Sequence, residues 1–492
     1  MKDFLYSKLV RSLVLAGGAS ALMCLAGCAT VGPDYVPPSL KVPADWHAAL
    51  PHEGSTTNLL HWWAGFNDPA LDLLLRSAES ESPTLGQAAG AIAAARASRE
   101  QAAADLLPKA SAGAGLTRSG TSRLDNPNLP AGSTSLPASA TTRSGGLDAS
   151  WEVDLFGSIR RSEQAAMARL QARQAEWHDA RISLAAEVGS EYINFRACQV
   201  LLQLQQRNLA SLRKTADSTK AAVDQELMAP AESTLAAAGV ANAQASLRAQ
   251  RAECDLGIKA LVALTGIDEP GLRQTLAKDR PAIPMPPELD IRSVPVQLLS
   301  QRPDLVAAER SLAAASADIG VAEANRYPRL SLLGSISVSH SDTQGSGVST
   351  APWSFGPSLS LPLFDGGRLR AQVASARAGY QTALANYRGR VRTAVREAEQ
   401  ALVRLDAATR RSEDIANAAA GYRRYFDAAE RNWTAGGINL LSLEEARRNA
   451  LQAEQADIST RRDRVLDGIA LYKALGGGWQ RTDNMTVAGV SQ

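Results

Sequence analysis

Residues that could carry out chemistry are scarce in this chain of 492 residues. Apart from an N-terminal trio among prolines, its histidines lie far from one another and from any cysteine, which does not suit a metal site. No glycine-rich loop precedes a Lys-Ser or Lys-Thr pair, and no nucleophile elbow occurs. We therefore expect no catalytic residue, no metal and no cofactor, and a secreted hydrolase is the remotest alternative. The histidines are His47, His52, His61, His178 and His340.

One cysteine has a context that does predict chemistry. A basic start precedes a short apolar segment at residues 12–23, which is typical of an export signal. The segment leads into Leu25-Ala26-Gly27-Cys28, a pattern like the bacterial lipobox, in which the cysteine is acylated. We expect residues 1–27 to be removed as a signal peptide and Cys28 to be the lipid-attachment site. Ala29, in place of Asp, favours retention in the outer membrane.

Two further cysteines, Cys198 and Cys254, remain in the mature chain. They could pair in an oxidising compartment, but both lie in helical patterns and far apart in sequence. Buried free thiols are therefore the expectation.

Acidic and hydroxyl side chains, with Gly356 among them, recur on one face of two segments, 147–155 and 353–363. The alternating apolar and polar residues predict strands with one face of each kind, which suits a transmembrane barrel around water better than a soluble sandwich. Segments 110–117 and 330–340 supply two more strands. Four strands cannot close a water-filled barrel, so several subunits must contribute. The expected lumen-facing residues are Asp148, Glu152, Asp154, Ser354, Ser358 and Ser360.

Long helices must hold these strands. Hydrophobic residues make up 45% of the chain and aromatic ones only 5%, so the apolar content is mostly small and aliphatic. The long Ala-rich stretches predict closely packed helices. A mean hydropathy of −0.16 excludes a polytopic helical membrane protein, and a net charge of +2 excludes nucleic-acid binding by bulk charge.

The chain contains two copies of one unit. Pro83 and Pro108 in the first copy match Pro303 and Pro328 in the second. About 12 extra residues in the first copy fall in 118–144, which we expect to be a loop. Each long helix, the second of which has a heptad seam, should be ~100 Å long and extend through an aqueous compartment. The expected helices are 83–106, 158–228 and 231–266, then 303–326, 366–433 and 438–475.

Several motifs resemble, in order, those of the TolC superfamily, in the lipoprotein (NodT/OprM-like) branch of outer-membrane factors of resistance-nodulation-division (RND) efflux systems. The resemblance covers about residues 28–479. It implies a mostly α protein with a membrane β-barrel: four β-strands per subunit form a twelve-stranded barrel in a homotrimer, continued by a long α-helical coiled-coil barrel. An equatorial domain would use 44–80, 267–301 and the residues after 476. The motifs lie at 28–38, 62–71, 151–157, 302–310 and 475–479.

The expected domain organisation follows from the repeats and this resemblance. A signal peptide (1–27) precedes a lipidated extended segment (28–66). The first repeat (67–266) contains a β-hairpin at about 109–155, and a linker or equatorial segment (267–301) follows. The second repeat (302–476) contains a β-hairpin at about 329–363, and a flexible tail (477–492) ends the chain.

The resemblance implies an outer-membrane channel of a tripartite efflux system that passively conducts small molecules from the periplasm to the outside. Its implied partners are a periplasmic adaptor (membrane fusion) protein, an inner-membrane RND-type pump and outer-membrane lipids, with no nucleic acid. A structural envelope-spanning lipoprotein and the outlet of a type I protein secretion system are the alternatives. The sequence does not name the exported substrate.

A resting channel needs a closed end. The helical hairpins turn near 226–233 and 434–442, where we place the periplasmic gate. Paired glycines permit a tight second turn, whereas the first turn lacks the family's usual glycine. The candidate gate residues are Glu232, Gly436, Gly437, Asn439, Leu440 and Leu441.

Overall fold

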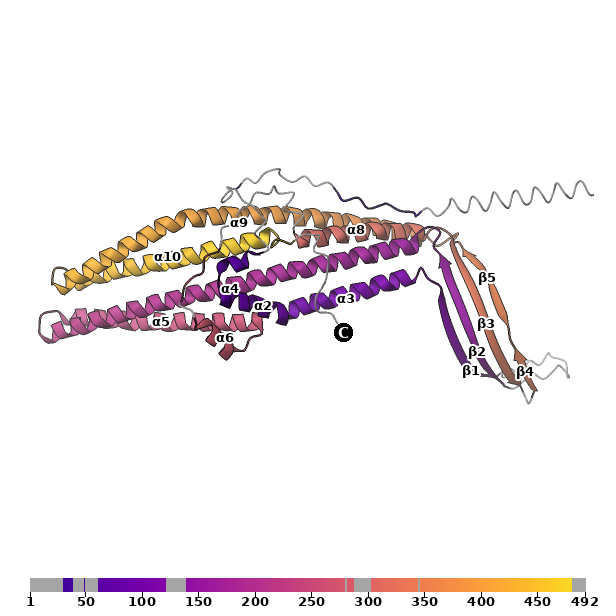
Figure 1. Ribbon diagram of the computed structural model, residues 1–492, viewed down its shortest axis with the longest axis horizontal. Coiled ribbons are helices and arrows are strands. Elements are labelled where there is room, and N and C mark those ends of the chain that lie inside the picture. The colour runs from indigo at the N-terminus through magenta and orange to yellow at the C-terminus, as the bar shows by residue number, and fades with distance from the viewer. Residues whose placement is uncertain are drawn as a thin grey trace, which may run out of the picture. The chain divides into compact units, whose positions relative to one another are not determined.

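Two sets of helices and strands follow one another in the same order (Figure 1). The computed structural model describes residues 30–38, 48, 61–120, 139–278, 281–286, 302–343 and 346–479. The first set comprises α3 (Pro83–Ala104), β1 (Lys109–Ser119), β2 (Ala140–Val153), α4 (Ser158–Asp224) and α5 (Pro230–Thr265). The second comprises α8 (Pro303–Ala324), β3 (Arg329–Thr343), β4 (Ser346–Thr350), β5 (Trp353–Ser360), α9 (Arg368–Thr434) and α10 (Leu440–Ala474).

The expected combination of long helices and a few antiparallel strands is confirmed. Both long helices, α4 and α9, contain 67 residues, and they start and end 210 positions apart. In the part of the chain described, no helix combines the length and apolar character needed to cross a membrane.

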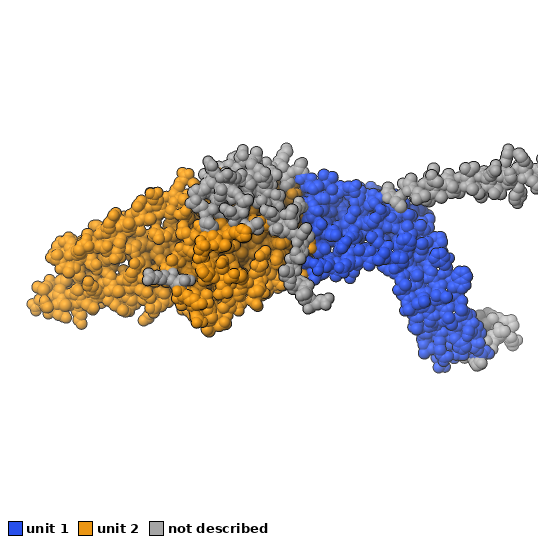
Figure 2. Space-filling view, viewed as in Figure 1, with its two compact units in different colours: residues 1–38, 92–172, 309–386 blue, residues 39–91, 173–308, 387–492 orange. Residues whose placement is uncertain are grey.

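The chain divides into two compact units (Figure 2). The first unit consists of residues 1–38, 92–172 and 309–386, and holds every strand that the structure describes. The second consists of residues 39–91, 173–308 and 387–492, and holds both turns at the hairpin tips.

The strands of the first unit form one antiparallel sheet. β1 pairs with β2, β2 with β3, and both β4 and β5 pair with β3, β5 over its first half and β4 over its last residues. The strand predicted at 353–363 is present as β5 over Trp353–Ser360, and β4, on the same edge of β3, is a piece that the sequence analysis missed. The break between β4 and β5 contains Pro352, which has no N–H to donate to a strand ladder, although its carbonyl accepts from Ser337 N at 3.0 Å.

The loop expected at 118–144 is also partly strand. β1 continues to Ser119, and β2 begins at Ala140 and pairs with β3 from its first residue. Its first residues include Thr, Arg and Gly and show no clear apolar alternation, so the partner strand rather than local pattern imposes their extended conformation.

The second unit has an apolar core beside the long helices. It joins a short 3-10 helix η3 (Trp63–Phe66), α2 (Pro69–Glu81) and α6 (Glu269–Leu276) to α4, α5, α9 and α10. Asp-Pro at the start of α2 explains that helix locally, because Asp68 Oδ1 accepts from Ala70 N and Leu71 N. Trp62 is 1% exposed and stacks on Tyr472, with the ring centroids 5.0 Å apart.

The Arg302-Pro303-Asp304 motif contributes to the same unit. Arg302 precedes α8, is buried, donates to the carbonyl of Ala474 at 2.8 Å and pairs with Asp304 and Glu397 at 2.9 Å each. The motif therefore ties the start of α8 to the end of α10 and to α9.

Candidate functional site: strand face and hairpin tips

The polar residues expected on the strands lie in rows on one face of the sheet. Residues directly opposite each other in register share a face. Asp148 faces Ser335, which in turn faces Ser354, and the two serine hydroxyls lie 2.8 Å apart. Glu152, Ser331 and Ser358 form a second row. Four of the predicted residues are thus grouped by register, with acids on β2 and hydroxyls on β5.

The opposite face is apolar and exposed. Leu147, Ile336 and Trp353 form one row across β2, β3 and β5, and they are 59%, 56% and 77% exposed. Large apolar side chains at this exposure in a folded sheet indicate a surface that another molecule covers.

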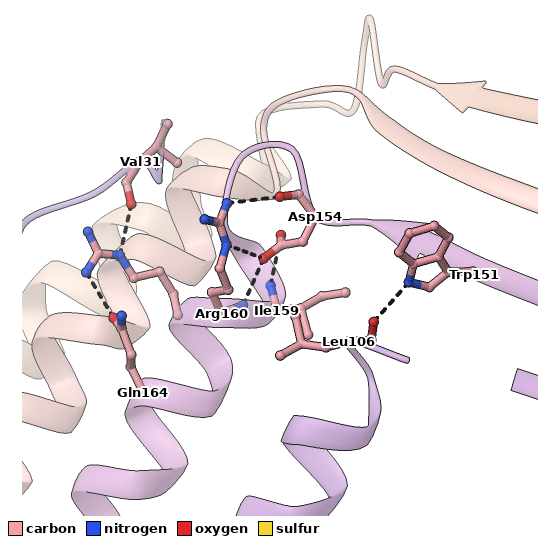
Figure 3. Close-up of polar contacts among 8 residues, drawn as sticks. Val31, Leu106, Trp151, Asp154, Ile159, Arg160 and Gln164 are labelled. Carbon is pink, nitrogen blue, oxygen red and sulfur yellow. Dashed lines mark hydrogen bonds and ion pairs between the residues drawn. The ribbon is translucent and has the colours of Figure 1, made fainter. Parts of the chain in front are cut away.

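Asp154 does not belong to the polar rows. It lies one residue beyond β2, where its carboxylate accepts from Ile159 N and Arg160 N at the start of α4 (Figure 3). Asp365 does the same for α9 by accepting from Leu369 N. The expectation that Asp154 faces a lumen is therefore wrong, because the helix N-terminus takes its carboxylate.

Ser360 lies at the end of β5 opposite Arg329, on the same face as Ser358 by alternation. It extends the polar face to the strand–helix junction. On the other face, Trp151 Nε1 donates to the carbonyl of Leu106 at 2.9 Å (Figure 3).

The two turns at the hairpin tips have the same hydrogen bonds. Gly436 N donates to Trp433 O and Gly437 N to Asn432 O, which is the pattern of a Schellman cap. In the first hairpin, 210 positions earlier, Glu226 N donates to Val223 O and Leu227 N to Ala222 O. Glu226 occupies the left-handed region at φ 59°, where the second turn has Gly436 at 79°. The missing glycine therefore leaves the geometry of the first turn unchanged.

The gate candidates divide by exposure. Leu440 is 1% exposed and packs inside the hairpin tips with Phe426 and Leu443, so it offers no apolar surface outside its own subunit. Leu441, next to it, is 67% exposed. Asn439 begins α10, and its side-chain oxygen accepts from Ser442 N at 2.9 Å.

Glu232, in the first turn of α5, is half-buried, and its Oε2 has no hydrogen-bond partner within the described ranges.

Arg447 joins the two hairpins, and sequence reasoning missed it. It lies on α10 with its side chain 5% exposed, donates to Thr215 Oγ1 of α4 at 2.7 Å, and also donates to Ser211. Its guanidinium lies 5.1 Å from the Phe426 ring centroid of α9. Burial lowers the pKa of Arg447 and raises that of its partner Glu444. Nothing in the run Glu-Glu-Ala-Arg-Arg distinguishes this arginine from a solvated one.

The expectation of free thiols is wrong. Cys198 of α4 and Cys254 of α5 form a disulfide, with the sulfurs 2.06 Å apart. Their separation in sequence is 56 residues, but the two positions are nearly equidistant from the turn at 225–229. In an antiparallel helix pair, such positions lie side by side.

The expected lipid-attachment residue, Cys28, and the signal peptide lie outside the described residues. Within those residues, no three His, Cys, Asp or Glu side chains are grouped as a metal site would require.

Comparisons with known proteins agree with this architecture. The family model described as outer membrane efflux protein matches residues 74–267 and 294–477. The chain is 32% identical to outer membrane protein OprJ of Pseudomonas aeruginosa over 96% of this chain and 98% of OprJ. It is 30% identical to nodulation protein T of Rhizobium leguminosarum bv. viciae over 94% and 93% of the two chains. The solved outer-membrane channel OprN has a TM-score of 0.80 at 31% identity, covering 92% of this chain and 100% of that one.

Proposed function

We infer the function from one premise: this chain belongs to the outer membrane efflux protein family. It is an outer-membrane channel of an efflux system. The observation that carries this conclusion is the family match, which extends over most of both repeats. A purely structural lipoprotein would need no polar row of acids and hydroxyls beside an apolar, exposed face.

We propose that transport through the channel is passive and that the chain is not an enzyme. The polar rows supply acids and serine hydroxyls, including Asp148, Glu152 and Ser354. Such groups favour cations without binding one solute tightly. The apolar face, with Leu147 and Trp353, would meet lipid.

The functional unit is proposed to be a homotrimer. Among the strands that the structure describes, β1 pairs with β2 alone, and β4 and β5 pair with β3 alone, which leaves two open edges. Open strand edges cannot face lipid, because their backbone groups would lose hydrogen bonds without water to replace them. Three copies of the four-strand path, with β4 and β5 as one interrupted strand, close twelve strands.

The partners are proposed from the family: a periplasmic adaptor protein and an inner-membrane RND-type pump. We propose that lipid on Cys28 anchors the chain to the outer membrane. We place the resting constriction at the second tip, 434–442, where Leu441 and the Gly436-Gly437 turn supply an exposed apolar residue and a tight bend. The adaptor would open it by moving the packed helices.

Single-channel recording in a planar bilayer tests the proposal. The full chain, shown to be trimeric by native mass, should give discrete conductance steps with a preference for cations. The combined change Asp148→Asn and Glu152→Gln should reduce that preference. Glu100→Gln, on an exposed position of α3, removes one acid outside the sheet and should leave it unchanged. A monomeric mass, or conductance steps without any preference for cations, would contradict the proposal.

A further inference from the structure

A short extended segment near the N-terminus is seated on the first unit. We call residues Thr30–Tyr35 the N-terminal strap. Val31 N donates to the carbonyl of Phe156 at 3.1 Å, just after β2 and just before α4 (the Val31 carbonyl appears in Figure 3). The strap thus begins at the strand–helix junction.

Arg161 of α4 binds the strap through its backbone. Its guanidinium donates to the carbonyls of Val31 and Gly32 at 3.2 Å each and to Asp34 Oδ1 at 2.8 Å. Gln164 Oε1 accepts a fourth hydrogen bond at 3.0 Å and orients the group. The Arg161 side chain is 5% exposed. A buried guanidinium needs such a set of acceptors, so removing the strap would leave it without most of them.

Glycines allow the strap to lie this close. Gly32 has φ +89°, and a Cβ added there would stand 2.4 Å from Gly320 Cα on α8. A Cβ on Gly320 would come within 3.0 Å of the Arg161 side chain, and one on Gly157 within 2.4 Å of Thr30. At Gly32 and Gly320, backbone therefore packs directly on backbone, which a chance surface contact would not require.

Tyr35 holds the other end. Its hydroxyl donates to Glu309 Oε1 of α8 at 2.7 Å, and its ring packs against Ala168, Ala313 and Ala314. Glu309 is buried and also accepts from Arg310 Nε at 2.8 Å. The strap is thus fixed to α4 and α8 at both of its ends.

The strand–helix junctions expose large apolar side chains. Leu107 before β1, Tyr327 before β3, and Leu363 and Phe364 after β5 are 63%, 42%, 89% and 93% exposed. Trp151, near the end of β2, is 37% exposed. Aromatic residues with a polar group collect where a membrane protein meets the lipid headgroups.

We propose that the strap sets the height of the lipid anchor: Arg161 and the Gly32–Gly320 contact hold it so that the acylated N-terminus enters the periplasmic leaflet of the outer membrane level with these junction side chains. Cys28 is two residues from Thr30, and two residues of chain span at most about 7 Å. Because Thr30 contacts Gly157, the lipid can only start beside the β2–α4 junction. Arg161 is then a positioning residue for the anchor. The inference rests on the proposed lipidation of Cys28.

Spin labelling of the full chain in liposomes tests the strap. A nitroxide on Val36→Cys, an exposed position just after the strap, should give an immobilised spectrum. Gly32→Ala, which unseats the strap without altering a helix, and Arg161→Met should each cause loss of the immobile component. The matched controls are Pro33→Ala in the same segment and Arg169→Met, an exposed α4 residue paired with Asp318 of α8; both should keep it.

Measuring the membrane depth of labelled side chains tests the second part of the proposal, which is the level of the junction side chains. A nitroxide on Leu363→Cys should collide more with oxygen than with an aqueous nickel chelate, and one on Leu441→Cys at the tip should do the reverse. An immobile component that survives both Gly32→Ala and Arg161→Met, or aqueous accessibility at Leu363→Cys, would overturn the inference. Mass spectrometry of the N-terminal peptide tests the lipidation of Cys28 separately from the role of the strap. An unacylated Cys28 would overturn the lipid anchor itself, whatever the spin-label spectra show.

Discussion

The two hairpins, α4–α5 and α9–α10, have nearly the same lengths and the same hydrogen bonds in their turns, yet they are secured differently. The first has a disulfide, Cys198–Cys254, well away from its tip. At the positions 210 residues later, the second has Ala408 and Arg464, which cannot form one.

At the tips, it is the second hairpin rather than the first that has the stabilising features. The second turn has Gly436 in the left-handed position and Asn439 as a capping side chain. The first has Glu226 in the left-handed position, and Ala229 precedes α5 without a side-chain cap. The repeat therefore shows two ways to hold an antiparallel helix pair: a covalent link along the pair, or favourable turn chemistry at its end.

Cross-linking the tips between subunits should have the largest effect, because it should block export at one tip and not at the other. If the second tip is the constriction, a bifunctional maleimide joining Leu441→Cys residues of neighbouring subunits should abolish export while trimer and insertion persist. Joining Leu227→Cys, an exposed residue of the first tip, should leave most export intact. Efflux of a fluorescent substrate from cells, with cross-linking scored on gels, measures both. Full export through cross-linked Leu441→Cys trimers would refute the placement.

Removing the disulfide should have the next largest effect. Replacing both Cys198 and Cys254 by Ala should lower the free energy of unfolding by about 4 kcal/mol, as expected for a closed loop of this length. Urea unfolding of the detergent-solubilised protein, followed by circular dichroism, measures the change. Reductant should destabilise the parent to the level of the variant and leave the variant unaffected; a parent insensitive to reductant would contradict the assignment.

A disulfide engineered into the second hairpin tests whether α9 and α10 move together. Ala408→Cys with Arg464→Cys would place a link at the positions equivalent to Cys198 and Cys254. If α9 and α10 move as a packed pair, export should persist in this variant after oxidation. Loss of export on oxidation and its recovery on reduction would instead show that the two helices slide past each other.

The helices could be predicted from the sequence because their ends carry local signals. Pro83, Pro303 and Pro230 each stand at a first helical position, and each helix begins within two residues of its expected start. Alternation identified the strands where one face is apolar, as at Trp151, but not at Ala140, where pairing with β3 decides.

The site was less predictable because its residues act through tertiary contacts. The cysteine pair depends on distance from the turn, not on separation in sequence. Asp154 continues the alternation of β2 yet caps a helix, and only the position of the chain reversal decides between the two roles. Arg447 and Arg161 occur in basic runs that are typical of solvated helix faces, so their burial has no sequence signal.

Breaking the contact between hairpins should have a moderate effect. Arg447→Met removes charged hydrogen bonds to Ser211 and Thr215 and leaves Glu444 without its partner, which should lower the free energy of unfolding by about 2 kcal/mol and raise resting conductance. Arg448→Met, on the exposed neighbour, is the control.

The effect of Arg447→Met should depend on pH. Burial already raises the pKa of Glu444 above its unfolded value, and losing the nearby guanidinium raises it further. A raised pKa means that the folded state binds the proton more tightly, so acidification through that folded pKa should reduce the penalty. A penalty that grows on acidification would contradict this role for Glu444.

The smallest effects are expected at the two left-handed positions, Glu226 and Gly436. There the two turns differ mainly in whether the residue with positive φ has a Cβ. Glu226→Gly should stabilise the first tip by about 0.5–1 kcal/mol, because a left-handed residue with a Cβ costs about 1–2 kcal/mol and the greater freedom of glycine in the unfolded chain offsets part of that gain. Gly436→Ala should destabilise the second tip by about 1 kcal/mol. A Cβ at Gly436 meets nothing within 4 Å, so its substitution isolates the backbone angle from packing. Hydrogen exchange of tip peptides should therefore slow in the first variant and quicken up to about fivefold in the second. Changes of the same sign at both tips would show that the turns, despite their identical hydrogen bonds, are held by different forces.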